Sequence, residues 1–295
     1  MATLKFWGVR GSIPTPGPAT VRYGGNTSCC ELRFNDTLFI LDAGSGLRVL
    51  GNELLKSKPP INANIFISHM HWDHIQGIPF FTPAFIPGNK FTFYGAKDAE
   101  KDLNDIIADQ MDPTYFPIEM KDMGSKLDFE QLAEGRYNID NTEVETIFVN
   151  HPGNALGYKF FIEQKSLIYI SDNEPFAGTF NDDLNQSNSN KDIILGEDGN
   201  QKLIAFLKNA DILIHDAQYT LDEYKKKMTW GHSPIEYTVD IAIHAGVKQL
   251  VLFHHDPMHD DDTIDEMLEN ARKYASGKKS KIIINAAAEG ETLNF

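Results

Sequence analysis

Short runs rich in β-branched, aromatic and other apolar residues recur along the chain, and such runs predict strands. They cover residues 3–8, 29–34, 37–42, 64–68, 90–95, 145–150, 156–162, 166–171, 211–216, 249–254 and 281–286. Segments 200–210, 233–246 and 263–276 instead repeat apolar residues at helical spacing. The early strands follow one another through short turns, which favours antiparallel pairing, and the later strands alternate with helices. The pattern predicts an α/β fold in which helices cover mixed β-sheets.

One helix start is specified in detail by the segment "GHSPIEYTVDIAIHAG". Ser233 is suited to the N-cap, Pro234 to the first helical position, and Glu236 completes a capping box three residues after Ser233. Gly246 is suited to end the helix. His232 is therefore expected just before a helix N-terminus, where backbone donors favour an anion.

The chain length, 295 residues, suffices for one large domain or two small ones. Residues 80–140 are punctuated by Pro and Asp, with one helix expected at 96–111. This stretch is either a lid-like insertion over a site or a plain surface excursion. Its neighbour "GIPFFTPAFIPG", residues 77–88, is apolar enough to cover a substrate or to meet a partner.

The acidic charge limits the classes of ligand. With 27 basic and 42 acidic residues the formal net charge is −15, which disfavours binding of a long nucleic acid. A small phosphorylated ligand stays possible, because bound metal ions can reverse the local field. The adjacent cysteines Cys29 and Cys30 lie in an expected strand and are predicted to be buried free thiols, as in a reducing compartment. Without a leader-like N-terminus or a membrane-spanning segment, we expect a cytoplasmic protein.

Four residues whose side chains can bind metal ions, three histidines and one aspartate, fall within six positions of "SHMHWDHIQG". His69, His71, Asp73 and His74 directly follow an apolar run. The chain has only ten histidines, so a chance cluster of this density is improbable. Imidazole and carboxylate at such spacing suit a divalent transition metal.

Further residues able to bind metal ions lie at the C-terminal ends of other expected strands, where α/β folds collect ligand sites. These are Asp42, His151, Asp172 and His254. His69, His71 and His151 would form one metal site, and Asp73, His74 and His254 a second. Asp172 would bridge them. A two-metal hydrolase site of this kind makes a nucleophile from water and clamps both the attacking and the leaving oxygen.

The sequence "HMHWDH", with the residues that follow it in order, resembles the metallo-β-lactamase superfamily from about residue 4 to the C-terminus. The resemblance implies a single domain over residues 1–295, with a four-layer αββα sandwich and a dinuclear site at the edge between two sheets. It implies that Asp42 supports the site through hydrogen bonds. His255 competes with His254 for the last ligand position, and we prefer His254 because it directly follows the strand.

Within the superfamily, "LIHDAQYT" and "WGHSPIE" are similar to two motifs of the ribonuclease Z-like branch. By motif position, Asp216 orients His232, which contacts the scissile phosphate. Asp replaces the usual Glu of the first motif and Pro replaces the Thr of the second. His215 is expected to support the site or to share the role of His232. The Gly-rich opening, residues 6–32, also resembles small-molecule phosphodiesterases of this branch.

The tRNA-processing members carry a long arm between the third and fourth metal motifs, and here residues 152–171 leave room only for a hairpin. We therefore expect a small phosphodiester substrate, such as a cyclic nucleotide or cyclic phosphate, and no long nucleic acid. Asp73 would be a ligand and a possible proton acceptor. The alternatives are a thioesterase or lactonase of the same superfamily and a non-enzymatic nucleotide-binding module. We expect two divalent metal ions, zinc first with manganese or iron as alternatives, and a possible homodimer.

Overall fold

Two seven-stranded β-sheets form the centre of the computed structural model, which describes residues 2–97, 101–176, 195 and 198–295. In order across the first sheet, the strands are β14 (Thr292–Asn294), β1 (Ala2–Gly8), β2 (Cys29–Phe34), β3 (Thr37–Leu41), β4 (Asn62–Phe66), β5 (Lys90–Ala96) and β6 (Lys126–Leu132). Across the second sheet they are β13 (Ile283–Ala286), β12 (Gln249–Phe253), β11 (Ile212–Asp216), β10 (Lys165–Ile170), β9 (Leu156–Ile162), β8 (Thr142–Phe148) and β7 (Gly135–Ile139). Both sheets are mixed, as predicted.

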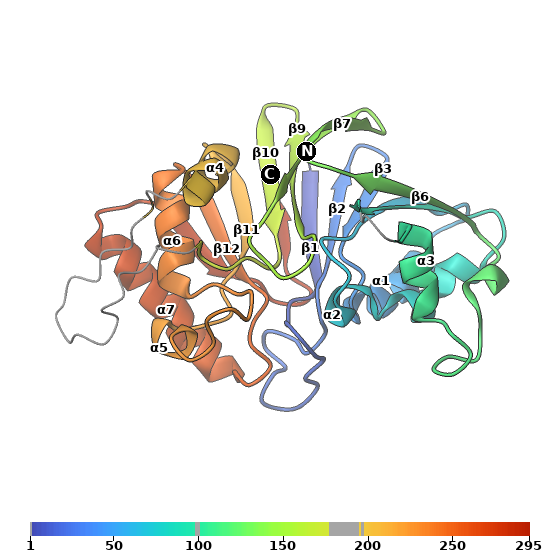
Figure 1. The fold of residues 1–295 in the computed structure, drawn as a ribbon, viewed down its shortest axis with the longest axis horizontal. Coiled ribbons are helices and arrows are strands. Elements are labelled where there is room, and N and C mark those ends of the chain that lie inside the picture. Colours follow the sequence, from blue (N-terminus) through green and yellow to red (C-terminus); the bar gives the residue numbers. More distant parts are fainter. Residues whose placement is uncertain (1, 98–100, 177–194, 196–197) are drawn as a thin grey trace.

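Helices cover the outer face of each sheet, so the molecule has four layers (Figure 1). The first sheet is covered by α1 (Gly46–Leu54) and α3 (Leu103–Asp109), and the second by α4 (Asp198–Leu207), α6 (Ile235–His244) and α7 (Asp261–Gly277). The short helices α2 (Trp72–Ile75), η1 (Ile78–Phe80), η2 (Thr82–Phe85), η3 (Met120–Asp122) and α5 (Leu221–Tyr224) lie in connections. This arrangement confirms the αββα sandwich.

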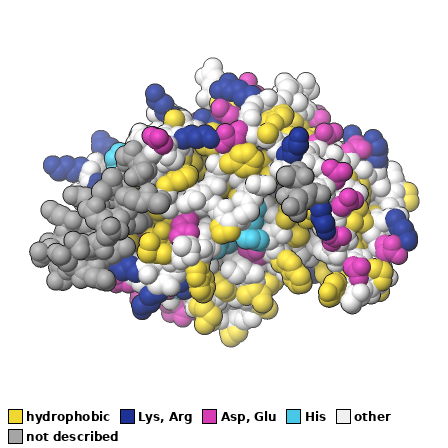
Figure 2. Space-filling model, viewed as in Figure 1, with side chains coloured by type: hydrophobic (Ala, Val, Ile, Leu, Met, Phe, Trp, Pro, Cys, Tyr) yellow, Lys and Arg dark blue, Asp and Glu magenta, His cyan; other side chains and the backbone are white. Residues whose placement is uncertain are grey.

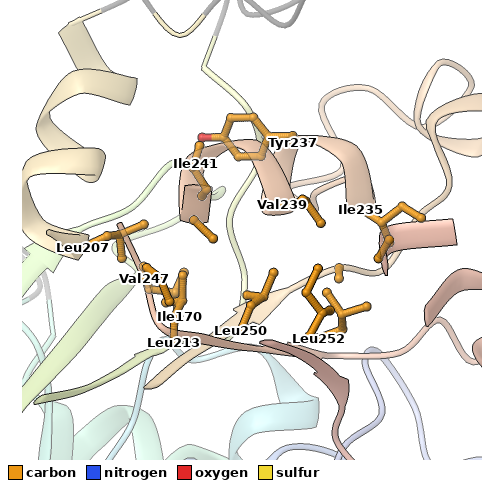
Figure 3. Close-up of a cluster of buried hydrophobic side chains, with 14 of the residues drawn as sticks. Ile170, Leu207, Leu213, Ile235, Tyr237, Val239, Ile241, Val247, Leu250 and Leu252 are labelled. Atoms are coloured by element: carbon orange, nitrogen blue, oxygen red, sulfur yellow. The ribbon is translucent and has the colours of Figure 1, made fainter. Parts of the chain in front are cut away.

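An apolar core lies between the two sheets. Phe66 of the first sheet packs edge-on against Tyr158 and Phe160 of the second, with ring centroids 5.1 and 5.2 Å apart. Such aromatic pairs add to the free energy gained by burying their area. A separate core joins α6 to the second sheet, with Val239 of α6 above Leu250 and Leu252 of β12 (Figure 3). The two cores hold the strand ends of the second sheet in fixed positions.

Three strands were not predicted from the sequence. β6 and β7 are the edge strands of their sheets, and β14 is a short edge strand. Most residues of β6 are only half-buried, because its outer edge has no neighbouring strand. Antiparallel pairing of the early strands holds for β1 to β3, whereas β3 to β6 are parallel to one another. The reason is that α1 and the α2–η2 connection carry the chain back before β4 and β5.

The stretch 80–140 supplies β5, β6 and β7 to the two sheets, so most of it is not an excursion. The expected helix at 96–111 is shorter: α3 begins at Leu103, because Ala96 ends β5 in register with Leu132 of β6. Residues 98–100 of that expected helix lie outside the described part of the chain. The apolar side chains of residues 77–88 mostly face the core under α1, and Phe80 is an exposed exception.

Two local predictions have different outcomes. The prediction that Ser233 is the N-cap was wrong, because α6 begins at Ile235 after Pro234. Ser233 Oγ instead donates a hydrogen bond to the carbonyl oxygen of Asn173 at 2.6 Å. This tertiary contact takes the side chain away from the helix terminus. Cys29 and Cys30 are buried free thiols, as predicted. Among the described helices, none combines the length and apolar character that crossing a membrane requires.

Candidate metal centre and active site

The strand ends bring the predicted site residues to one edge of the sandwich. Asp42 follows β3, Asp172 lies two residues after β10, and Asp216 is the last residue of β11. β10, β11 and β12 are parallel, so their carboxyl ends meet at one edge of the second sheet. β3 and β4 are parallel in the first sheet, and their ends bring Asp42 and the loop that begins α2 to the same edge. Histidine side chains are visible near the middle of the molecular face in Figure 2.

The first group of donors consists of three histidines, and their ring nitrogens converge. His69, His71 and His151 each offer an atom within 4.8 Å of the others. The His151 Nε2 atom lies 3.1 Å from His71 Nδ1. Burial lowers the pKa of His69 well below its usual range and also lowers the pKa values of His71 and His151. These imidazoles are therefore neutral near pH 7, which leaves lone pairs available for a metal ion.

The second group consists of Asp73, His74, Asp172 and His254, all buried. The Asp73 Oδ2 atom lies 3.2 Å from His74 Nε2 and 3.0 Å from His254 Nε2. Burial alone would raise the pKa of Asp73, but His74 and His254 hold it well below its usual range. The carboxylate therefore stays ionised and requires positive charge nearby, which a divalent cation can supply.

Asp172 lies between the two groups and turns one oxygen toward each. Its Oδ1 atom is 3.2 Å from His74 Nε2 and 3.3 Å from His254 Nε2. Its Oδ2 atom is 3.7 Å from His69 Nε2 and 3.8 Å from His151 Nε2. This is the arrangement expected of a carboxylate shared by two cation sites.

The unsatisfied atoms in this cluster fit metal ions. Within the described residues, His69 Nε2, His74 Nε2 and Asp172 Oδ1 are buried without a hydrogen-bond partner. Buried polar atoms normally have partners, because leaving one unpaired costs about 1–3 kcal/mol. Nitrogen and carboxylate donors that converge in this way suit divalent transition metals.

Outer hydrogen bonds orient the histidines so that Nε2 faces the cluster. His74 Nδ1 donates to Asp42 Oδ2 at 2.7 Å, and His254 Nδ1 donates to Gln218 Oε1 at 3.1 Å. His151 Nδ1 donates to the carbonyl oxygen of Gly231 at 2.8 Å. Fixing the tautomer in this way is typical of metal-binding histidines.

Asp42 occupies the supporting position that the sequence resemblance implied. Besides His74, its carboxylate accepts hydrogen bonds from Ser68 N at 2.7 Å, Ser68 Oγ at 2.9 Å and the Tyr169 hydroxyl at 2.7 Å. These contacts use both oxygens, so Asp42 acts on the cluster through His74.

Sequence reasoning did not single out the backbone that holds Asp73 and His254. The Ser12 N–H donates to Asp73 Oδ2 at 2.7 Å. A Cβ atom at Gly11 would lie 2.5 Å from the His254 ring, so only glycine permits this approach. Gly11 and Ser12 both lie in the Gly-rich opening, which was the only feature of the sequence that pointed to this backbone.

Glu174 is a second residue that sequence reasoning did not identify. Its carboxylate accepts from Thr229 N at 2.6 Å, Gly231 N at 2.9 Å and the Tyr224 hydroxyl at 3.1 Å. The Gly231 carbonyl in turn orients His151. Glu174 therefore positions the loop that precedes His232.

His232 lies over the second donor group and is held by Asp216. Its Nδ1 donates to Asp216 Oδ2 at 3.0 Å, and its ring stacks on that of His254 with centroids 5.0 Å apart. Burial alone would lower the pKa of His232, but Asp216 and, more weakly, Asp172 and Asp73 raise it to about 9. Asp216 also accepts from the backbone N–H groups of Asn173 and Gln218. This buried carboxylate is therefore fixed in position.

The structure places His215 and His255 outside the cluster. His215 Nδ1 lies 2.7 Å from the Asp216 carbonyl oxygen and 3.4 Å from Thr238 Oγ1 of α6. Because adjacent strand residues point to opposite faces, His215 points away from the side on which Asp216 meets His232. His255 Nε2 donates to the Ala287 carbonyl oxygen at 3.0 Å. His254, not His255, therefore reaches the donor group.

Known proteins share the family and the fold. The family described as "Beta-lactamase superfamily domain" matches residues 37–255. A ribonuclease Z of Thermoplasma acidophilum is 26% identical over 92% of this chain and 91% of its own length. The metallo-β-lactamase fold protein YhfI of Bacillus subtilis has a TM-score of 0.69 at 18% identity, and all of each chain is covered. A diphosphatase of the PhnP family has a TM-score of 0.65 at 17% identity, with 100% of this chain and 98% of the other covered.

Proposed function

Because the chain belongs to the β-lactamase superfamily, whose domain matches residues 37–255, we propose that it is a dinuclear metal-dependent phosphodiesterase that hydrolyses a small phosphodiester. The observation that carries the proposal is the position of Asp172, with one oxygen toward each of two donor groups. The His232–Asp216 pair beside those groups adds a proton donor suited to a phosphate ester.

Two cations would be held by separate donor sets that share one carboxylate. In the first set are His69, His71 and His151, in the second Asp73, His74 and His254, with Asp172 common to both. We propose zinc because imidazoles predominate, and manganese or iron would use the same donors. When bound, such ions polarise phosphoryl oxygens and lower the pKa of water.

The side chains of this chain then divide the proton transfers of hydrolysis. A water oxygen forms a bond to phosphorus as the P–O bond to the leaving group breaks. Asp73, held by the Ser12 N–H, accepts the proton of the attacking water. His232, held at Nδ1 by Asp216, turns Nε2 to the leaving oxygen and gives it a proton, or hydrogen-bonds a phosphoryl oxygen.

Two features support a small substrate. β9 and β10 form a tight hairpin, so only residues 152–171 separate His151 from Asp172, without an arm that could grip tRNA. The net charge of −15 repels a long polyanion. The rival function is RNA cleavage, favoured by the name of the ribonuclease Z relatives. A thioesterase or lactonase would use the same metals but would have no need of the His232–Asp216 pair.

Substrate size gives a direct test of this proposal. We expect the metal-loaded protein to hydrolyse bis-p-nitrophenyl phosphate and 2′,3′-cyclic nucleotides. We expect it to leave a precursor tRNA uncut at low salt, where the repulsion between the acidic protein and RNA is least screened. The measurement is the release of p-nitrophenol and nucleotide beside gel analysis of the tRNA. Accurate removal of a tRNA 3′ trailer at a rate comparable to that of the small esters would show that the short hairpin and the acidic charge do not decide the substrate.

A further inference from the structure

Large aromatic side chains are exposed beside the donor cluster. Trp72 lies between His71 and Asp73 in sequence, and 78% of its surface is exposed. Tyr115 is 79% exposed and Phe80 is 55% exposed. Exposed aromatic groups that gather at one place commonly mark a binding surface. The proposed mechanism uses none of these three side chains.

These aromatics line one pocket of about 500 Å³. Its wall also includes Phe116, whose ring meets that of Phe80 edge-on at a centroid distance of 5.3 Å. The volume lies in the range of small-molecule sites. We call this site the aromatic pocket and define it by Met70, Trp72, Phe80, Ile106, Tyr115 and Phe116.

The aromatic pocket adjoins the metal site. Met70 and Ile106 also line a smaller pocket of about 190 Å³, whose walls include His69 and His71. A molecule that reaches past Met70 and Ile106 from one pocket to the other would place one end against the histidines and the other among the aromatic rings.

The chemistry of the pocket favours a flat, uncharged group. Among the described residues that line the pocket, Asp109 alone has an ordinarily charged side chain, and Lys101 pairs with it at 2.6 Å. The described lining therefore includes no lysine, arginine or histidine that could bind a phosphate. Gln110 also lines the pocket, and its Nε2 atom has no hydrogen-bond partner within the described residues. Aromatic rings with an amide at one edge suit a nucleobase, which stacks and accepts hydrogen bonds.

We propose that the aromatic pocket binds the nucleobase of a nucleoside phosphodiester whose phosphate lies at the donor cluster. This inference rests on the proposed function for the position of the phosphate, and it narrows the substrate class from small phosphodiesters to nucleotides. Trp72 and Tyr115 provide the stacking surfaces.

Binding to the metal-loaded protein tests the pocket without any reaction. Calorimetry with AMP and with ribose 5-phosphate separates the contribution of the base, because both ligands carry a ribose phosphate. We expect wild type to bind AMP more tightly, and Tyr115→Ala to weaken AMP roughly 5- to 100-fold, as loss of base stacking does. Ribose 5-phosphate should bind both proteins equally. Tyr115→Phe keeps the ring and should behave as wild type, and the exposed position makes unfolding of either variant improbable.

Kinetics provide a second readout with a matched pair of esters. Tyr115→Ala should raise KM for 2′,3′-cyclic AMP by about the same factor by which it weakens AMP binding, and leave kcat for this substrate unchanged. It should not alter the hydrolysis of glycerol 1,2-cyclic phosphate, which has the same reacting group and no base. Trp72→Phe should keep most of the affinity for cyclic AMP, whereas Trp72→Ala should lose most of that affinity.

The outcomes separate the pocket from the proposed function. If wild type hydrolyses neither ester but prefers AMP in a Tyr115-dependent way, the phosphodiesterase proposal fails and the pocket proposal stands. Equal affinity of wild type for AMP and ribose 5-phosphate would overturn the pocket proposal. The pocket proposal would also be overturned if Tyr115→Ala bound AMP as wild type does but changed from dimer to monomer in sedimentation. The aromatic pocket would then be a surface for self-association.

Discussion

Replacing Asp172 by asparagine is expected to remove most of the bound metal and to reduce phosphodiesterase activity by roughly a thousandfold or more. Asp172 turns its two oxygens toward different donor groups, so its charge serves both cations. Metal ions supply several kcal/mol to the transition state of phosphoryl transfer, and each 1.4 kcal/mol corresponds to about tenfold in rate. Asparagine keeps the shape of the side chain, so the loss of metal and activity would result from the missing charge and not from a cavity.

Elemental analysis of the purified proteins, beside the hydrolysis of bis-p-nitrophenyl phosphate, measures this effect. Wild type is expected to carry two ions per chain. Asp211→Asn is the matched control, because Asp211 precedes β11 at the opposite edge of the second sheet and pairs with Lys248. The control should retain both metal and activity. An Asp172→Asn protein with two ions and near wild-type activity would rule out the shared carboxylate.

Replacing His232 by alanine is expected to slow the hydrolysis of 2′,3′-cyclic AMP by roughly 10²–10⁴-fold, the usual effect of general acid catalysis. The Asp216 carboxylate 3.0 Å from Nδ1 leaves Nε2 free to face the leaving oxygen. A ribose alkoxide needs a proton to depart, and p-nitrophenolate does not. The loss on bis-p-nitrophenyl phosphate should therefore be much smaller, with the metal content unchanged.

Imidazole added to the His232→Ala protein should restore part of the activity on the cyclic nucleotide, which a merely structural role would not allow. His244→Ala is the control, since His244 lies at the end of α6 and donates to the Asp240 carbonyl oxygen. Equal losses on both substrates would mean that His232 stabilises phosphoryl oxygens. Losses of no more than a few-fold on either would assign His232 to structure alone.

The convergence of the proposed ligands was predictable, because their chemistry and their position in sequence agree. A dense His/Asp motif after one strand, with single residues after other strands, converges wherever parallel strand ends meet. The structure brings all seven of the proposed ligands together in two adjoining groups. The structure also distinguishes His254 from His255 as the last proposed ligand, a choice that sequence position alone left open. His255 Nε2 hydrogen-bonds the Ala287 carbonyl oxygen, whereas His254 hydrogen-bonds Gln218 through Nδ1.

Residues that act through backbone groups were not predictable in the same way. Glu174 supports His151 by accepting from the Gly231 N–H, and Ser12 supports Asp73 through its own N–H. Neither role depends on a recognisable side-chain motif. Ser233 shows the converse: its local capping signal was strong, but a hydrogen bond to the Asn173 carbonyl oxygen took the side chain elsewhere. Tertiary contacts of this kind are absent from the local pattern.

The edge strands β6 and β7 were missed for a related reason. Strand signals in this chain are strongest where both faces are buried, as in β10 and β11. β6 has half-buried or exposed residues at all positions but the last, and it has a neighbouring strand on one side only. Its apolar residues Leu127 and Phe129 follow the two-residue period, so the signal was present but weak.

The substrate class of the metal-loaded protein decides most directly whether it is a phosphodiesterase. Initial rates should be measured with bis-p-nitrophenyl phosphate, a 2′,3′-cyclic nucleotide, an acyl thioester and a lactone, before and after removal of metal by a chelator. We expect metal-dependent hydrolysis of the two phosphodiesters and no more than trace rates with the thioester and the lactone. Efficient metal-dependent hydrolysis of the thioester or the lactone, with both phosphodiesters inert, would contradict this expectation.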